Sequence, residues 1–264
     1  MSSYLSSFYK VHNFDILLNP NHDLRDSSFK SNHEAVLRES DYIIFLAYDV
    51  GGARYLKENQ GQFHFLKNNS LVMLNTFAFL KEFESKFIFA SSEMAHDINS
   101  PYGVLKALGE DFTYSLGGVF VRFWNVYDYE VDRSKSHVIT DFVNQAIHYG
   151  QINMLTNGDE KRQFLYSDDC AKAIHEVLKR YEIFSGGDGV DITSFETVSI
   201  EKVGHLIASK TDSRLVKGNL NDLTRHQKMT PPRKRILDFW TPEYSLEQGI
   251  DLVIEKARRD LLRK

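Results

Sequence analysis

The sequence predicts an α/β fold in which helices cover both faces of a parallel sheet. Over the first two thirds of the 264 residues, short runs that are apolar throughout alternate with longer segments of helical periodicity. Strands of a parallel sheet are buried on both faces, so they lack the polar alternation of a half-exposed strand. Glycine pairs at 51–52 and 117–118 separate such segments, as turn residues do. The alternation therefore favours repeated strand–helix units.

The first half of the chain contains the clearer elements. A short helix is expected at 2–10. The apolar run Phe14-Asp15-Ile16-Leu17-Leu18 is ended by Asn19-Pro20-Asn21, which predicts a strand and a turn. The helix expected at 62–83 has apolar residues at helical spacing, among them Phe65, Leu66, Val72, Phe79 and Leu80. The other predicted elements are a helix at 31–39, strands at 42–47, 86–90 and 119–124, and a helix that contains Tyr102 and ends at Gly117-Gly118.

After Asn125 the alternation loosens. The expected elements are helices at 137–149, 168–181 and 199–210, short strands at 152–156 and 190–192, and a final helix from Ser245. This pattern predicts a larger α/β domain at 1–135 and, at 136–264, mainly a smaller lobe from which some segments return to the main sheet.

Composition excludes several protein classes. Hydrophobic residues make up 42% and charged residues 26%, and the net charge of −4 gives no general affinity for nucleic acid. The single cysteine, Cys170, excludes a disulfide framework. No apolar stretch reaches the ~18 residues that a membrane span needs, and the N-terminus lacks the features of a signal peptide. We expect a cytoplasmic protein with no membrane or nucleic-acid partner and, from the spacing of its histidines, no metal site.

Tyr102 and Lys106 carry the strongest chemical signal. Residues four apart on a helix lie on the same face, one turn from each other. A phenol normally has a pKa of about 10, and a nearby ammonium lowers it toward the range useful for a base. Ser92 lies just upstream at the end of the 86–90 strand, where its hydroxyl is expected to hold a substrate oxygen. This set suits proton transfer at a carbinol while a hydride leaves the same carbon.

Several motifs, in order along the chain, resemble those of the extended short-chain dehydrogenase/reductase family, which includes nucleotide-sugar epimerases, dehydratases and reductases. Tyr102, Lys106 and Ser92 match its catalytic triad. The other matching segments are Asp23-Leu24-Arg25-Asp26, Phe45-Leu46-Ala47-Tyr48 (His-Leu-Ala-Ala in the family), Val50-Gly51-Gly52, Asn68-Asn69, Arg122-Phe123-Trp124-Asn125-Val126-Tyr127, Gly158-Asp159-Glu160-Lys161-Arg162-Gln163-Phe164 with Asp168-Asp169, and Trp240-Thr241-Pro242 with Ser245-Leu246-Glu247-Gln248-Gly249-Ile250.

The resemblance implies a Rossmann-like doubly wound parallel sheet and a role for each matching residue. It implies that the domain at 1–135 binds a dinucleotide and that the lobe at 136–264 mainly binds the substrate. Tyr102 is expected to exchange the proton with the sugar hydroxyl, Lys106 to lower the tyrosine pKa and hold the nicotinamide ribose, and Ser92 to bond the reacting oxygen. The residues expected to contact NAD or NADP are Asp23, Leu24, Phe45, Leu46, Ala47, Asn69, Tyr102 and Lys106. The resemblance also implies a homodimer formed through the helices near 62–83 and 102–116.

A nucleotide-sugar substrate is the expected partner. Arg162 is expected to contact its diphosphate, since a guanidinium fork suits phosphate oxygens. The densest basic stretch, which includes Arg225 and Arg233, is a second candidate for that role. The full set of expected substrate contacts is Glu93, Asn125, Val138, Arg162, Arg225 and Arg233, and His137 is a candidate acid.

Two features depart from the family pattern. The family begins with a strand and a turn of the form Gly-x-x-Gly-x-x-Gly that holds the cofactor pyrophosphate, whereas this sequence starts where the first helix would be under way. A shortened form of a longer protein, a natural variant with weak or no dinucleotide binding, and a partner segment that supplies the strand all stay open. In addition, only ten positions separate Ser92 from Tyr102, and Glu93-Met94 replaces the Asp-Glu pair of dehydratases.

We therefore expect an NAD(P)-dependent epimerase or reductase acting on a nucleotide-activated sugar through hydride transfer at a sugar carbon. Met94 cannot move a proton, which argues against 3,5-epimerase chemistry. The alternative is a non-catalytic member of the fold that binds a sugar nucleotide or a protein partner without dinucleotide.

Overall fold

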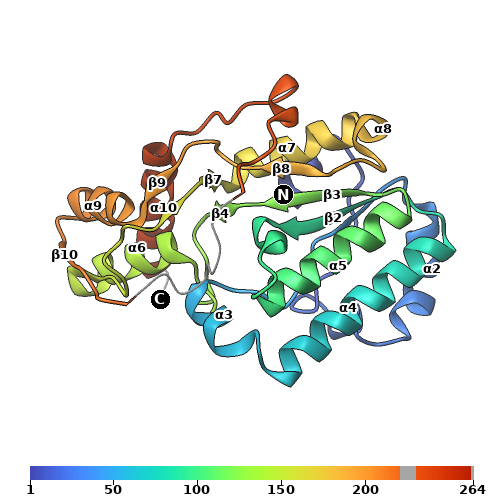
Figure 1. The fold of residues 1–264 in the computed structure, drawn as a ribbon, viewed down its shortest axis with the longest axis horizontal. Coiled ribbons are helices and arrows are strands. Elements are labelled where there is room, and N and C mark those ends of the chain that lie inside the picture. Colours follow the sequence, from blue (N-terminus) through green and yellow to red (C-terminus); the bar gives the residue numbers. More distant parts are fainter. Residues whose placement is uncertain (221–229, 263–264) are drawn as a thin grey trace.

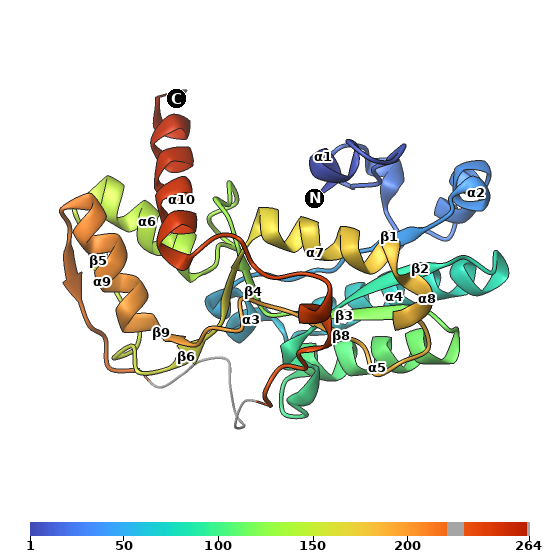
Figure 2. The same cartoon turned by 90° about the horizontal axis from the view of Figure 1, so that it is seen from above.

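The computed structural model describes residues 1–220 and 230–262 and confirms the α/β class. Its central sheet contains four parallel strands in the order β1 (Ile43–Phe45), β2 (Phe87–Ser92), β3 (Val119–Phe123) and β8 (Val190–Ile192) (Figures 1 and 2). β1 lies at one edge, and no strand within the described residues pairs with its outer side. β2 is buried along its whole length, as the apolar run at 87–90 predicts, and the burial extends to the two serines that end the strand.

Helices cover both faces of this sheet. On one face, α4 (Phe63–Glu82) and α5 (Pro101–Ser115) pack on Phe87, Phe89 and Phe120, with α2 (Phe29–Glu39) beside α4. On the other face, α7 (Ser167–Lys179) and α8 (Tyr181–Phe184) cover Ile88, Val121 and Ile192, and α1 (Ser2–Leu5) packs against α7. Figure 2 shows α7 and α5 on opposite sides of the strands. Because side chains alternate along each strand, they pack into two separate apolar cores, one on each face of the sheet.

A smaller lobe follows the carboxyl end of β3. It is built from α6 (Val138–Tyr149), α9 (Ile200–Thr211) and α10 (Leu246–Leu261), which share a third apolar core (Figures 1 and 2). Its strands form three pairs: β4 (Asn125–Tyr127) with β7 (Phe164–Tyr166), β5 (Gln151–Asn153) with β10 (Arg214–Val216), and β6 (Lys161–Arg162) with β9 (Val198–Ser199). β8 and α7 lie beyond residue 135 in sequence but complete the main sheet and its cover. The division at 135/136 stays a prediction.

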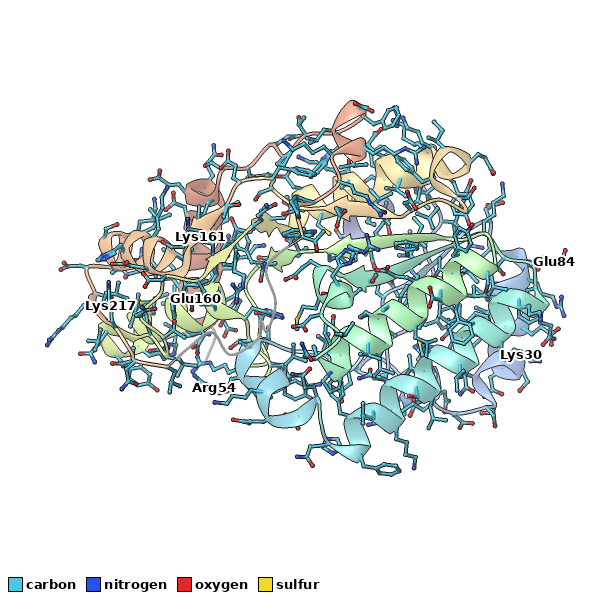
Figure 3. The ribbon with its side chains drawn as sticks, in the orientation of Figure 1. Lys30, Arg54, Glu84, Glu160, Lys161 and Lys217 are labelled. Atoms are coloured by element: carbon cyan, nitrogen blue, oxygen red, sulfur yellow. The ribbon has the colours of Figure 1, made fainter. Side chains whose placement is uncertain are left out.

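Short elements connect these layers: α3 (Ala53–Asn59) and the 3-10 turns η1 (Pro20–His22), η2 (Glu93–His96) and η3 (Arg235–Asp238). Arg54 of α3 points toward the smaller lobe (Figure 3), where it forms an ion pair with Asp141 of α6 at 3.7 Å. The main domain and the lobe are therefore linked by charge contacts as well as by the chain.

The predicted strand at 14–18 is wrong. The chain turns there instead, because Leu18 and Asn19 donate backbone hydrogen bonds to the carbonyl of Asp15. The Asp15 side chain also accepts from the amide of Leu17 at 2.8 Å, the local competition by which aspartate favours turns over strands. Leu17 is 91% exposed. An apolar run predicts a strand only where a neighbouring strand can pair with it.

A buried ion pair joins α5 to the sheet. Arg122 of β3 donates to the Glu110 carboxylate through both Nε (2.8 Å) and Nη2, and Ser91 of β2 donates its hydroxyl to the same carboxylate. The Arg122 and Glu110 side chains are only 7% and 11% exposed. A bidentate pair of this kind fixes geometry, and loss of one member leaves the other charge buried and unpaired.

We predict that Glu110→Ala lowers the free energy of unfolding by about 3 kcal/mol, because the Arg122 charge loses its partner inside the protein. Urea denaturation followed by circular dichroism measures this. The matched control is Lys30→Met, which breaks the exposed Lys30–Glu82 pair (Lys30 is labelled in Figure 3) and should cost less than about 1 kcal/mol. Equal losses in the two variants would contradict the structural role of the buried pair.

Candidate functional site

Ser92, Tyr102 and Lys106 converge at the carboxyl end of β2. Ser92 is the last residue of that strand. α5 begins shortly afterwards with Ser100 as its N-cap, whose hydroxyl accepts from the amide of Gly103, and with Pro101 in its first turn. A Cβ on Gly103 would lie 2.3 Å from the carbonyl oxygen of Met94, so glycine permits α5 to approach η2. The helix face bearing Tyr102 and Lys106 is thereby turned toward Ser92.

The three side chains are buried and hydrogen-bonded. Ser92, Tyr102 and Lys106 are 9%, 7% and 3% exposed. Tyr102 forms a side-chain hydrogen bond with Ser92, and the Lys106 ammonium donates to the carbonyl oxygen of Ala90 at 2.6 Å. The structure therefore brings together the hydroxyl, phenol and ammonium that the sequence singled out. Their catalytic roles stay predictions.

Burial changes the protonation of this group in a way the sequence did not predict. We expected the Lys106 ammonium to lower the pKa of Tyr102, but burial dominates and raises that pKa, with the nearby Glu93 carboxylate adding to the rise and the Ser92 hydrogen bond opposing it. Burial likewise lowers the pKa of Lys106 to about 7. In this state the phenol holds its proton and suits a proton donor.

Tyr48 is a fourth member of the site that the sequence reasoning missed. Its ring lies with the Lys106 ammonium 3.6 Å from the ring centroid, a cation–π contact. It also meets the Tyr102 ring edge to face at 6.0 Å. The Tyr48 hydroxyl is buried and has no hydrogen-bond partner among the described residues. The available signal was the tyrosine that stands where the His-Leu-Ala-Ala motif ends in alanine.

The loop that carries Tyr48 is held by its neighbour Asp49. The Asn69 side chain accepts from the Asp49 amide at 2.7 Å and donates to its carbonyl at 3.1 Å. The Asp49 carboxylate accepts from Tyr55 at 2.7 Å and from Lys135 at 2.8 Å. Asn69 is fully buried, so its side chain is engaged by the loop. The expected cofactor contact of Asn69 stays a prediction.

The other predicted cofactor residues are spread over different environments. Asp23 pairs with Arg25 through its carboxylate, and this hydrogen bonding lowers the pKa of Asp23. Leu24 is half-buried and packs on the aromatic core that contains Phe45, itself only 3% exposed. The following residues, Leu46 and Ala47, are exposed. Phe45 therefore faces the protein interior, whereas the strand end beyond it faces outward.

On the substrate side, Glu93 lies near Tyr102, as its effect on that phenol shows. Asn125 is the first residue of β4, and its side-chain amide donates to the carbonyl oxygen of Gln163 at 3.4 Å. Arg162, which precedes Gln163 in sequence, is buried. Val138 is the first residue of α6. The contacts of these side chains with substrate stay predictions.

The Arg233 guanidinium donates to the carbonyl of Asp188, and the Arg233 backbone amide donates to the Asp191 carboxylate of β8 at 3.0 Å. Burial lowers the pKa of His96, in the turn that follows Ser92, and the Arg233 charge adds to this lowering. The substrate contact of Arg233 stays a prediction. Arg225 lies outside the described residues. His137 is the N-cap residue of α6, and its ring contacts the Glu130 carboxylate at 2.7 Å.

Within residues 1–220 and 230–262, no group of three histidine, cysteine or acidic side chains is placed to hold a metal ion. No helix in the same part of the chain is long and apolar enough to cross a bilayer.

The buried amine of Lys106 predicts a specific pH dependence of stability. Its pKa is about 7 when folded and near the ordinary 10.5 when unfolded, so between these values the unfolded chain binds the extra proton. Folding stability should therefore rise with pH through this window, by at most about 1.4 kcal/mol per pH unit, and the loss on lowering the pH should be complete near pH 7. Urea titrations of wild type and Lys106→Met from pH 6.5 to 9.5 measure the difference. Parallel curves for the two proteins would show that Lys106 keeps its ordinary pKa.

Comparison with known proteins agrees with this architecture. The sequence profile of the NAD dependent epimerase/dehydratase family matches residues 7–192. A putative UDP-glucose 4-epimerase of Methanocaldococcus jannaschii is 26% identical over 210 residues, which are 70% of this chain and 68% of that protein. In three further curated relatives the match spans 35%, 39% and 58% of their length, so the chain covers less than two thirds of each.

Solved structures share the fold. UDP-glucose 4-epimerase of Thermotoga maritima, solved with UDP-glucose, has a TM-score of 0.74 at 20% identity, over 90% of this chain and 84% of that one. The enzyme WbmF of Bordetella bronchiseptica, solved with NADH, has a TM-score of 0.73 at 20% identity, over 91% and 77%. At this identity the likeness concerns fold alone. The profile, however, matches well over half of the sequence, and the chain belongs to the NAD dependent epimerase/dehydratase family.

Proposed function

We propose that the chain carries the proton-transfer and substrate-binding part of an NAD(P)-dependent enzyme that epimerises or reduces a nucleotide-activated sugar. The observation that carries the proposal is the convergence of Ser92, Tyr102 and Lys106 at the end of β2. Family membership supports the enzyme class. The relatives named as UDP-glucose epimerases support a sugar nucleotide as substrate.

The donor set fits the hydroxyl-rich end of a dinucleotide. Lys106 donates one hydrogen bond to Ala90 and otherwise faces the Tyr48 ring, so a ligand hydroxyl that replaced that ring would find a buried donor. Tyr102 and Ser92 add two hydroxyls beside it. When bound, the nicotinamide would supply the hydride acceptor or donor.

The protein's own part is proton transfer at the sugar oxygen. Tyr102 is protonated in the present state because burial raises its pKa, so it is ready to donate a proton to a carbonyl oxygen in the reductive direction. Ser92, which is bonded to Tyr102, is placed to hold that same oxygen in line. In the reverse direction the phenolate accepts the hydroxyl proton, and a protonated Lys106 stabilises it electrostatically.

The substrate nucleotide is proposed to lie along the junction of the sheet and the smaller lobe. Glu93, Asn125, Val138 and Arg162 come from four segments that border this junction. Arg162 is the cation proposed for the diphosphate, because a guanidinium offers paired donors to phosphate oxygens. Domain closure over the sugar would then exclude water from the Tyr102 hydroxyl.

We predict that Tyr102→Phe lowers kcat for a UDP- or GDP-sugar by about 10² to 10⁴-fold, the usual worth of a general acid or base, with the sugar-nucleotide Kd changed by less than about threefold. Turnover is followed by chromatography of the sugar nucleotides with added NAD or NADPH. Tyr149→Phe is the matched control, since Tyr149 ends α6 and is 76% exposed.

Unchanged turnover in Tyr102→Phe would remove this mechanism. If the unmodified protein neither binds NADH nor gains melting temperature with NAD or NADP, but still binds a sugar nucleotide, the non-catalytic alternative is favoured.

We further propose a homodimer formed through α4 and α5. These helices pack side by side on one face of the sheet (Figures 1 and 2) and expose large apolar side chains, namely Phe63, Leu74, Val104, Leu108 and Tyr114. Leu108→Glu should shift the mass measured by light scattering from dimer to monomer, because a charge would be buried in the interface. Leu17→Glu, at an exposed turn elsewhere, should leave it unchanged. A monomeric wild type would contradict this proposal.

A further inference from the structure

The side chain of Tyr48 occupies the open side of the Lys106 ammonium. Its ring centroid is 3.6 Å from the Lys106 nitrogen, close enough that no hydroxyl fits between them. On the other side the same nitrogen is bonded to the Ala90 carbonyl at 2.6 Å. Lys106 itself is only 3% exposed. A ligand that is to bond this ammonium must first displace the ring of Tyr48.

The contacts of Tyr48 are those of a displaceable cover. Its hydroxyl is buried without a hydrogen-bond partner among the described residues, and an unpaired buried hydroxyl costs free energy in the position seen here. The tyrosine as a whole is half-buried, and the preceding residues Leu46 and Ala47 are exposed. A swing of the ring toward the exposed strand end would take it away from the apolar core that it packs against and would allow its hydroxyl to form hydrogen bonds.

The backbone beside Tyr48 is fixed, which limits the movement to the side chain and its own residue. Asn69 bonds both backbone groups of Asp49. Lys135, from the segment before α6, bonds the Asp49 carboxylate. Because Lys135 lies at the start of the smaller lobe, its contact with Asp49 connects the loop that carries Tyr48 to that lobe.

We propose that Tyr48 is an aromatic lid that closes the Lys106 side of the site and must swing away before a dinucleotide ribose can reach the ammonium. This proposal rests on the proposed function of the same site, to which it adds a barrier to ligand entry. The lid covers Lys106 and Tyr102 in the conformation described. Removing its ring should therefore favour ligand binding, whereas removing an essential core side chain would not.

Two measurements on the whole chain test the lid. The first is acylation of Lys106 by acetic anhydride at pH 8, quantified by peptide mass spectrometry, with Lys30 as internal reference because it is exposed and far in sequence. The second is NADH affinity from fluorescence titration. Circular dichroism melting of each variant checks that the fold is kept at the assay temperature.

Tyr48→Ala should raise the acylation rate of Lys106 at least fivefold relative to Lys30 and tighten NADH binding about tenfold. Tyr48→Phe is the matched control. It keeps the ring and removes only the unpaired hydroxyl, so Lys106 should stay as protected as in wild type, NADH should bind no tighter, and the melting temperature should hold or rise.

The outcomes separate the lid from the proposed function. If Lys106 is acylated equally in wild type and Tyr48→Ala, the lid is overturned, whatever NADH does. If NADH binds wild type and Tyr48→Ala with equal affinity, the proposed cofactor stands and the lid is overturned. If acylation rises but NADH binds neither protein, the proposed function fails, and with it the role of Tyr48 toward a cofactor.

Discussion

The packing of α5 against β2 is the contact on which the rest of the site depends. Two glycines permit it: a Cβ on Gly103 would meet the carbonyl of Met94, and one on Gly109 would meet the Phe89 ring at 2.4 Å. The Glu110–Arg122 pair then fixes the helix against the sheet. As a result Tyr102 and Lys106, on one face of α5, lie beside Ser92 at the end of β2. The two glycines allow the backbone of α5 to approach β2 closely, and the buried ion pair fixes the position of α5 on the sheet.

The same close packing determines the chemistry of the group. Removing Tyr102 and Lys106 from water favours their neutral forms, so the phenol keeps its proton and the amine loses much of its basicity. With a pKa of about 7, Lys106 is partly protonated at neutral pH, whereas the Tyr102 phenol keeps its proton. The ring of Tyr48 lies against the Lys106 nitrogen and limits the access of other groups to it.

The smaller lobe contributes to the site through contacts with the loop after β1 and not through the group of Ser92, Tyr102 and Lys106. Lys135 bonds Asp49 and Arg54 pairs with Asp141, so the loop after β1 is held from the lobe side as well as by Asn69. This arrangement makes the conformation near Tyr48 sensitive to how the lobe sits on the sheet. The chain belongs to the NAD dependent epimerase/dehydratase family.

Local sequence signals determined much of the fold. The apolar runs at β2 and β3 specify buried strands, and the spacing along α4 and α5 specifies helices, because side-chain periodicity follows directly from backbone geometry. The order of motifs also identified Ser92, Tyr102 and Lys106 as a group. Tertiary structure decided what periodicity cannot encode. The apolar residues at 14–18 turn instead of pairing, because strand formation needs a partner and Asp15 offers a local alternative. Burial reversed the expected pKa shift of Tyr102, since desolvation depends on every neighbouring segment. Tyr48 reached Lys106 from a different strand end, a contact between residues 58 positions apart in sequence that only the packed chain creates.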